Sequence, residues 1–212
     1  MMRHFILRLS LIALLALTAA TVASAQNQTP AAPAGTPPPG APQQRRGAVQ
    51  VLTLSSSAWL DGGQIPAKYT QAGEQVSPPL AWSNVPDGVT SFVVIAHDVD
   101  AAIGNGTDDI LHWMVWNIPG TARSLPEAVP QGTQGPDGAR QISASGPYYR
   151  GPGAPAAGPA HHYVFELYAL DAMLDVPAVG QSPPLTRAAV VAAMAGKIRG
   201  KAAYVGLFRR SQ

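Results

Sequence analysis

Apolar residues between positions 49 and 210 fall in short runs that are separated by Pro and Gly turns. Residues 49–56 alternate between apolar and polar positions and are rich in β-branched side chains, as expected for a strand with one buried face. Residues 91–98 and 110–118 are almost continuously apolar, which suits central strands covered on both faces, and residues 162–170 alternate again. Several strands without intervening helices favour antiparallel sheets packed as a sandwich.

One segment near the C-terminus has helical character. Residues 187–199 read RAAVVAAMAGKIR, Thr186 can cap the N-terminus, and Gly200 suits the left-handed position just beyond the end. Residues 202–210 are long enough for a closing strand. The sequence therefore predicts a mainly β fold, an antiparallel sandwich with one C-terminal helix and few short helices.

The first 47 residues follow a different pattern. Arg3, His4 and Arg8 precede an apolar run at residues 9–20, and small residues at 23–25 form a cleavage site, which predicts a Sec-type secretory signal over residues 1–25. The apolar run is shorter than the roughly 20 residues of a spanning helix, which argues against an uncleaved anchor. Residues 26–47 are rich in Pro, Ala and Gly and predict a disordered tether, which leaves residues 48–212 as one domain. We expect a periplasmic or secreted protein with no stable membrane insertion after signal cleavage.

Charge and cysteine content narrow the function classes. Four of the 14 Lys and Arg residues precede position 48, so the domain carries ten against all 12 Asp and Glu residues. A slightly acidic domain argues against nucleic-acid binding, which needs a basic face. The basic C-terminal stretch, residues 187–210, is interpreted as a solvated helix face or as a surface for an anionic partner. Because the chain has no cysteine, disulfides, thiolate metal sites and a lipid-modified cysteine are excluded.

Four histidines, at positions 97, 112, 161 and 162, fall at predicted strand ends that border two Gly- and Pro-rich loops, residues 127–145 and 146–160. Adjacent residues of a strand point to opposite faces, so only one of His161 and His162 can enter a given pocket. Asp98 and Asp100 can share a face if the chain stays extended there. Loops on a rigid sheet are the expected place for binding residues.

Three chemistries are compatible with this cluster. His112, His161 and an aspartate could bind zinc or a similar ion, although no HExxH spacing is present. A serine hydrolase would need a nucleophile in a strained turn, and the chain has no GxSxG motif. A preformed anion pocket could combine imidazole donors, loop N–H groups and a tyrosine hydroxyl such as that of Tyr148 or Tyr163.

A set of motifs in order along the domain resembles the phosphatidylethanolamine-binding protein family, and most closely its bacterial Raf-kinase-inhibitor-like branch. The motifs are SPPLAW (77–82), HDVDAA (97–102), LHWMVWNIPG (111–120), YYRGPGAP (148–155), HHYVFELYALD (161–171) and the helix-strand ending at residues 185–210. The resemblance implies a β-sandwich with a small pocket for phosphate or phosphorylated head groups, and no established catalytic activity, cofactor or metal.

The resemblance also implies the site residues. By motif position, these are Asp98, Asp100, His112, Gly151, Pro152, His161 and Tyr163. The chain departs from the family's usual Asp-Pro-Asp-Ala-Pro sequence at Val99 and Ala102, which replace both prolines. Because a cis peptide before a non-proline residue costs about 2.5 to 4 kcal/mol, we expect trans peptides there.

These observations predict an exported binding protein for small anionic ligands that acts without catalysis and modulates an unidentified protein partner through the loops around the pocket. One of the two aspartates is expected to accept a hydrogen bond from His112 or His161 and to favour imidazolium, so binding should weaken as pH rises. The alternatives are a hydrolase or metal-dependent enzyme that uses the same His and Asp cluster, and an inhibitor that binds its target through the basic C-terminal surface.

Overall fold

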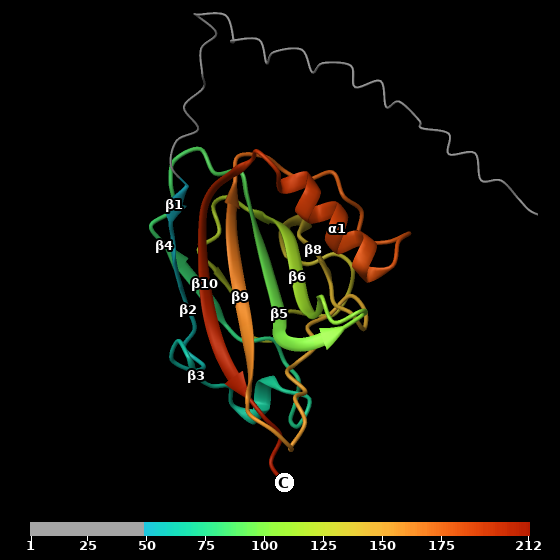
Figure 1. The fold of residues 1–212 in the computed structure, drawn as a ribbon. Coiled ribbons are helices and arrows are strands. Elements are labelled where there is room, and N and C mark those ends of the chain that lie inside the picture. The colour runs from blue at the N-terminus through green and yellow to red at the C-terminus, as the bar shows by residue number, and fades with distance from the viewer. Residues whose placement is uncertain (1–48) are drawn as a thin grey trace, which may run out of the picture. The chain divides into compact units, whose positions relative to one another are not determined.

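The structure, a computed structural model, describes residues 49–212, and the predicted signal and tether lie outside this range. Two β-sheets form the domain, with a helix on the outer face of the larger sheet (Figure 1). The strands are β1 (Gln50–Val51), β2 (Thr53–Ser55), β3 (Gly63–Gln64), β4 (Leu80–Ser83), β5 (Ser91–Ile103), β6 (Asp108–Pro119), β7 (Ser124–Leu125), β8 (Arg140–Ile142), β9 (His161–Leu170) and β10 (Ile198–Phe208). The helices are α1 (Pro183–Met194) and the short 3-10 helices η1 (Ala67–Tyr69) and η2 (Pro136–Gly138).

The larger sheet has the order β1-β10-β9-β5-β6-β8, and β3 also pairs with β10; the smaller sheet has the order β2-β4-β7. All pairs are antiparallel except those of β1 and β3 with β10, which are parallel. The predicted mainly β sandwich is confirmed. The predicted strand at residues 49–56 is in fact two short strands in different sheets.

Strand β5 separates two hydrophobic cores. Phe92, Val94 and Ala96 pack between the sheets, while Val93 and Ile95 pack on the opposite face, where α1 covers the larger sheet. Burial on both faces explains why this segment is continuously apolar. The alternation continues past the apolar run, so the next two residues, His97 and Asp98, point to opposite faces of the sheet.

The predicted helix boundaries are wrong at both ends. Helix α1 spans Pro183–Met194, with Ser182 at the N-cap and prolines in its first turn, whose fixed φ and missing N–H suit that position. Thr186 therefore lies inside the helix and is buried. The left-handed glycine after the helix is Gly196, with φ +78°. Gly200, which was predicted for this position, instead lies in β10 and pairs with Gln50 of β1.

None of the helices between residues 49 and 212 is long and apolar enough to cross a lipid bilayer. No peptide bond in this range is cis.

Candidate functional site

The end of the large sheet, on the face turned towards the smaller sheet, carries a cluster of polar side chains. Asp98 at the end of β5 pairs in register with Tyr163 of β9, and His161 is two residues before Tyr163 on the same face. Ala96 of β5 pairs with Trp113 of β6, and the next residue of β5, His97, pairs with Leu111. His112, between Leu111 and Trp113, therefore has no partner on β5 and forms a β-bulge. The bulge brings the His112 ring edge-on to Tyr163, with 5.0 Å between ring centroids.

Asp98 fixes the orientation of His161. The Asp98 side chain is nearly buried, and its two carboxylate oxygens lie 2.9 and 3.1 Å from Nδ1 of His161. Its Oδ1 also accepts the backbone N–H groups of Asp100 and Ala101, each at 3.1 Å. Because an ionised carboxylate can only accept, Nδ1 of His161 carries a proton. The second ring nitrogen of His161, Nε2, donates to a ligand when the ring is protonated and accepts when the ring is neutral.

His112 has the opposite character. It is 3% exposed, and its Nδ1 lies 2.7 Å from the carbonyl oxygen of Arg150, to which it donates. Burial lowers the pKa of His112 more than the Arg150 carbonyl and the Asp98 carboxylate raise it. The neutral ring therefore has a lone pair on Nε2, which is buried without a hydrogen-bond partner among residues 49–212. A donor from a ligand or from a bound water molecule would satisfy this atom.

The loop that covers the cluster is held by tight backbone packing. The Tyr163 hydroxyl accepts the N–H groups of Gly153 at 3.2 Å and Ala154 at 3.0 Å, and burial together with the Asp98 charge raises the pKa of Tyr163. A Cβ at Gly151 would lie 2.7 Å from the carbonyl oxygen of Tyr69, so no larger residue fits without movement of the backbone. The neighbouring Pro152 is also buried.

Asp100 lies apart from these residues. Its Oδ2 accepts the backbone N–H of His162 at 2.6 Å and pairs with the His162 ring at 2.8 Å. The backbone hydrogen bond from His162 is the main reason that the pKa of Asp100 is lowered. Both side chains are well exposed, 41% for Asp100 and 55% for His162. The two aspartates therefore pair with different histidines, and Asp98 is the buried one.

A second polar cluster, which was not predicted from the sequence, lies on the opposite face, under α1. His97 hydrogen bonds to Asp109 through Nδ1, and its Nε2 lies 3.4 Å from Oε2 of Glu166. Arg187 of α1 hydrogen bonds to both carboxylate oxygens of Asp109. Burial alone would lower the pKa of His97, but the Glu166 and Asp109 carboxylates outweigh it and raise that pKa. The signal in the sequence was the strand alternation, which sends His97 and Asp98 to opposite faces.

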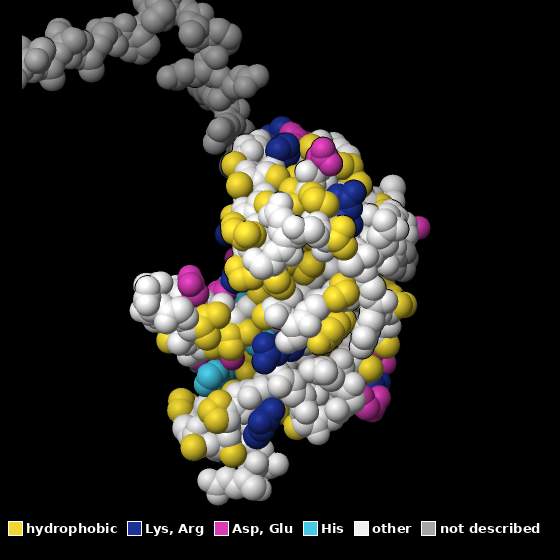
Figure 2. All heavy atoms as spheres, turned by 90° about the vertical axis from the view of Figure 1, so that its right-hand side faces the viewer, with side chains coloured by type: hydrophobic (Ala, Val, Ile, Leu, Met, Phe, Trp, Pro, Cys, Tyr) yellow, Lys and Arg dark blue, Asp and Glu magenta, His cyan; other side chains and the backbone are white. Residues whose placement is uncertain are grey.

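Histidine side chains reach the surface beside basic and acidic side chains on the face shown in Figure 2. Within residues 49–212, no group of three or more His, Cys, Asp or Glu side chains is arranged to hold a metal ion.

A family model described as Phosphatidylethanolamine-binding protein matches residues 55–209, nearly the whole described domain. The chain belongs to this family. A UPF0098 protein of Methanothermobacter thermautotrophicus is 40% identical over 161 residues, which cover 75% of this chain and 99% of the relative. The crystal structure of Escherichia coli YbcL, described as a new member of the mammalian PEBP family, aligns with a TM-score of 0.64 and 26% identity over 76% of this chain and 99% of YbcL.

A third relative, from Mycobacterium tuberculosis, has a name that describes it as a lipoprotein, LppC. It is 33% identical over 163 residues, which cover 76% of this chain and 74% of the relative. The resemblance predicted from the sequence motifs is thus confirmed at the level of family and fold.

Proposed function

We propose that this member of the phosphatidylethanolamine-binding protein family is an exported binding protein for small anionic ligands, phosphate or phosphorylated head groups. The observation that carries the proposal is the contact of the buried Asp98 carboxylate with Nδ1 of the partly exposed His161, whose Nε2 donates to the anion when the ring is protonated. A carboxylate 4 Å from a phosphate charge would repel it by about 4 kcal/mol at an effective dielectric of 20. Asp98 therefore acts through His161 and does not touch the anion.

The polarity of the two histidines limits the ligand further. His161 offers a donor, whereas the buried Nε2 of neutral His112 needs one. A phosphate monoester that keeps one proton supplies both an anionic oxygen and an O–H donor. A zwitterionic phosphoethanolamine group meets the same requirement, with its ammonium as the donor. The loop from Arg150 to Ala154 covers this site, and we propose that ligand binding acts on a protein partner through it.

Export is proposed from the predicted signal over residues 1–25, and the lipoprotein name of LppC is compatible with it. The chain has no cysteine to carry a lipid, so the proposed mature protein is free of that anchor. Mass spectrometry of the protein recovered from the periplasm of an expressing bacterium should give an N-terminus at Gln26. A full-length chain retained in the cytoplasm would contradict export.

Binding of the proposed anion should weaken as pH rises. We expect the affinity for sulfate, measured by titration calorimetry, to fall several-fold between about pH 6 and about pH 8, since an imidazolium ring attracts an anion and a neutral imidazole does not. Sulfate does not titrate there, so its pH dependence reports on the protein alone. Phosphate and phosphoethanolamine should bind more tightly than sulfate because they can also donate to His112. Equal affinity for sulfate across the range would remove the imidazolium from the proposal.

We further propose that the site binds its ligand without turnover. Purified protein is expected to show no hydrolysis of nitrophenyl esters or phosphates above the background of the His112→Ala variant. Turnover that disappears in this variant, or stoichiometric metal in the purified protein, would instead support an enzyme that uses the same cluster.

A further inference from the structure

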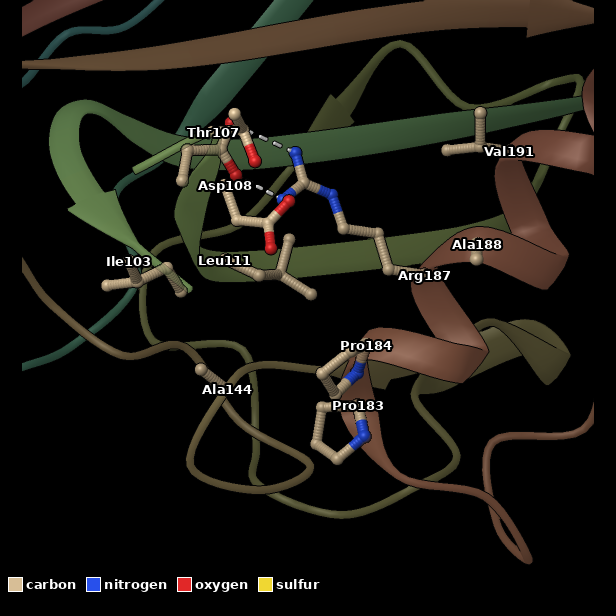
Figure 3. Close-up of a pocket in the computed structure, with 11 residues that line it drawn as sticks. Ile103, Thr107, Asp108, Leu111, Ala144, Pro183, Pro184, Arg187, Ala188 and Val191 are labelled. Carbon is tan, nitrogen blue, oxygen red and sulfur yellow. Dashed lines mark hydrogen bonds and ion pairs between the residues drawn. The ribbon is translucent and has the colours of Figure 1, made fainter. Parts of the chain in front are cut away.

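A cavity of about 510 Å³ lies on the α1 side of the large sheet. It opens between the end of the hairpin formed by β5 and β6, the residue Ala144, and the part of α1 from Pro183 to Val191 (Figure 3). The site of Asp98 and His161 lies on the other face of the large sheet. Along β5 and β9 these two side chains alternate with those that point towards α1, so they point towards the smaller sheet. The cavity is within the range of volumes typical of small-molecule sites, about 300 to 1,000 Å³.

The walls of this cavity are mainly apolar. They consist of the side chains of Ile103, Leu111, Ala144, Pro183, Pro184, Ala188 and Val191. Ile103 is 44% exposed and Val191 is 50% exposed, so hydrocarbon surface remains open to water at the rim. A ligand that covers this surface gains the hydrophobic free energy of its burial. No aromatic ring lines the cavity, which suits an aliphatic body.

The charged groups of the cavity leave it negative. Asp108 and Asp109 face a single cation, Arg187, and Arg187 is already hydrogen bonded to both oxygens of Asp109. Behind Asp109, His97 is balanced by Glu166. Asp108 is exposed and takes part in none of the salt bridges between residues 49 and 212. Figure 3 shows Asp108 on the hairpin side of the cavity, between Arg187 and Leu111.

We propose that this cavity binds a primary amine with an aliphatic body. The ammonium pairs with the Asp108 carboxylate, and the hydrocarbon chain lies against Leu111, Ala188 and Val191. The ion pair of Arg187 and Asp109 keeps the hairpin and the helix at a fixed spacing, so the cavity exists before the ligand arrives. An anionic amphiphile would meet two carboxylates and no free cation, and is excluded by charge.

The test compares three probes that share one chain, n-octylamine, n-octanol and octanoate, by NMR titration of the full domain at about pH 7. Octylamine should bind more tightly than octanol, and octanoate most weakly. The Asp108→Asn variant should lose roughly three- to fivefold of the octylamine affinity, because an ion pair at a partly exposed carboxylate contributes modestly. Asp87→Asn, an exposed carboxylate in a different loop, is the matched control and should leave the affinity unchanged.

A second variant tests the cavity itself. Ala188 is exposed on α1, so Ala188→Phe should fill the space without disturbing the core, and it should abolish octylamine binding. The His161→Ala variant should bind octylamine as the wild type does, since its site is on the other face. Octanoate binding as tight as that of octylamine, no loss in Asp108→Asn, or full binding in Ala188→Phe would each overturn the proposal.

Discussion

Replacing His161 with alanine should weaken phosphate binding by roughly 10- to 140-fold, the effect of losing one charged hydrogen bond worth about 1.5 to 3 kcal/mol. The same change at the adjacent His162 should alter the affinity less than about threefold, because its ring pairs with exposed Asp100 outside the cluster. The two variants differ by one position and remove the same side chain. A difference between their affinities for phosphate therefore reports on the face of the strand to which each ring points.

Calorimetric titration with phosphate at about pH 6 gives both affinities directly. The aspartates supply a second matched pair. Asp98→Asn removes the charge that holds His161 and should weaken binding, whereas Asp100→Asn should not. Denaturant unfolding of every variant separates loss of binding from loss of folding. Equal losses at His161 and His162 would place the anion elsewhere.

The large sheet could be predicted because its central strands are buried on both faces, and such strands read as continuous apolar runs. The alternation of side chains along a strand also predicted that His161 and His162 point to opposite faces of the sheet. The same alternation separates His97 from Asp98, but the sequence predicted only that His97 lies at a strand end. The missing information was the position of α1. Only the helix places Arg187 over Asp109, and this contact makes His97, Asp109 and Arg187 a half-buried ion network.

The position of Asp100 could not be obtained from the sequence. It shares a face with Asp98 only if the strand stays regular, and the pairing of β5 with β6 shifts register between Asp98 and Ile103. Such a shift depends on how many residues the partner strand supplies, which no local pattern encodes. His112 illustrates the same limit, because its bulge follows from the pairing of β5 with β6. The sequence alone offered His112 as one of several candidate ligands, and only the resemblance of its motif assigned it to an anion pocket.

The helix shows how local signals compete. Thr186 and Gly200 are acceptable caps by residue type, but the consecutive prolines Pro183 and Pro184 start the helix earlier. A β-strand then takes up residues 198–208, since β10 gains pairing with β9 along its length. Tertiary pairing therefore ended the helix before the point that helix propensity favoured.

The largest expected loss of stability in the ion network is that of Asp109→Ala, about 2 to 3 kcal/mol. Removing this carboxylate leaves Arg187 and His97 side by side without their shared partner. A fully buried pair would lose about 3 to 5 kcal/mol, and the side chains here are 13 to 27% exposed, which reduces the loss. Asp171→Ala removes the partner of Arg199, whose side chain is 46% exposed, and should cost less than about 1 kcal/mol.

The difference in unfolding free energy between wild type and Asp109→Ala should depend on pH. Burial opposes the charged form of Asp109, but Arg187 and His97 outweigh it and lower the pKa of Asp109, so its contribution is lost as pH falls below about 4. The pKa of His97 is raised, so its contribution is complete below about pH 6.5 and is lost as pH rises through the higher folded value. The difference should therefore be largest between about pH 4.5 and about pH 6.5 and should shrink on both sides. It should not vanish at higher pH, because Arg187 keeps its charge there. If urea unfolding gives the same difference in unfolding free energy from about pH 4 to about pH 9, protonation of His97 does not contribute to the stability of this network.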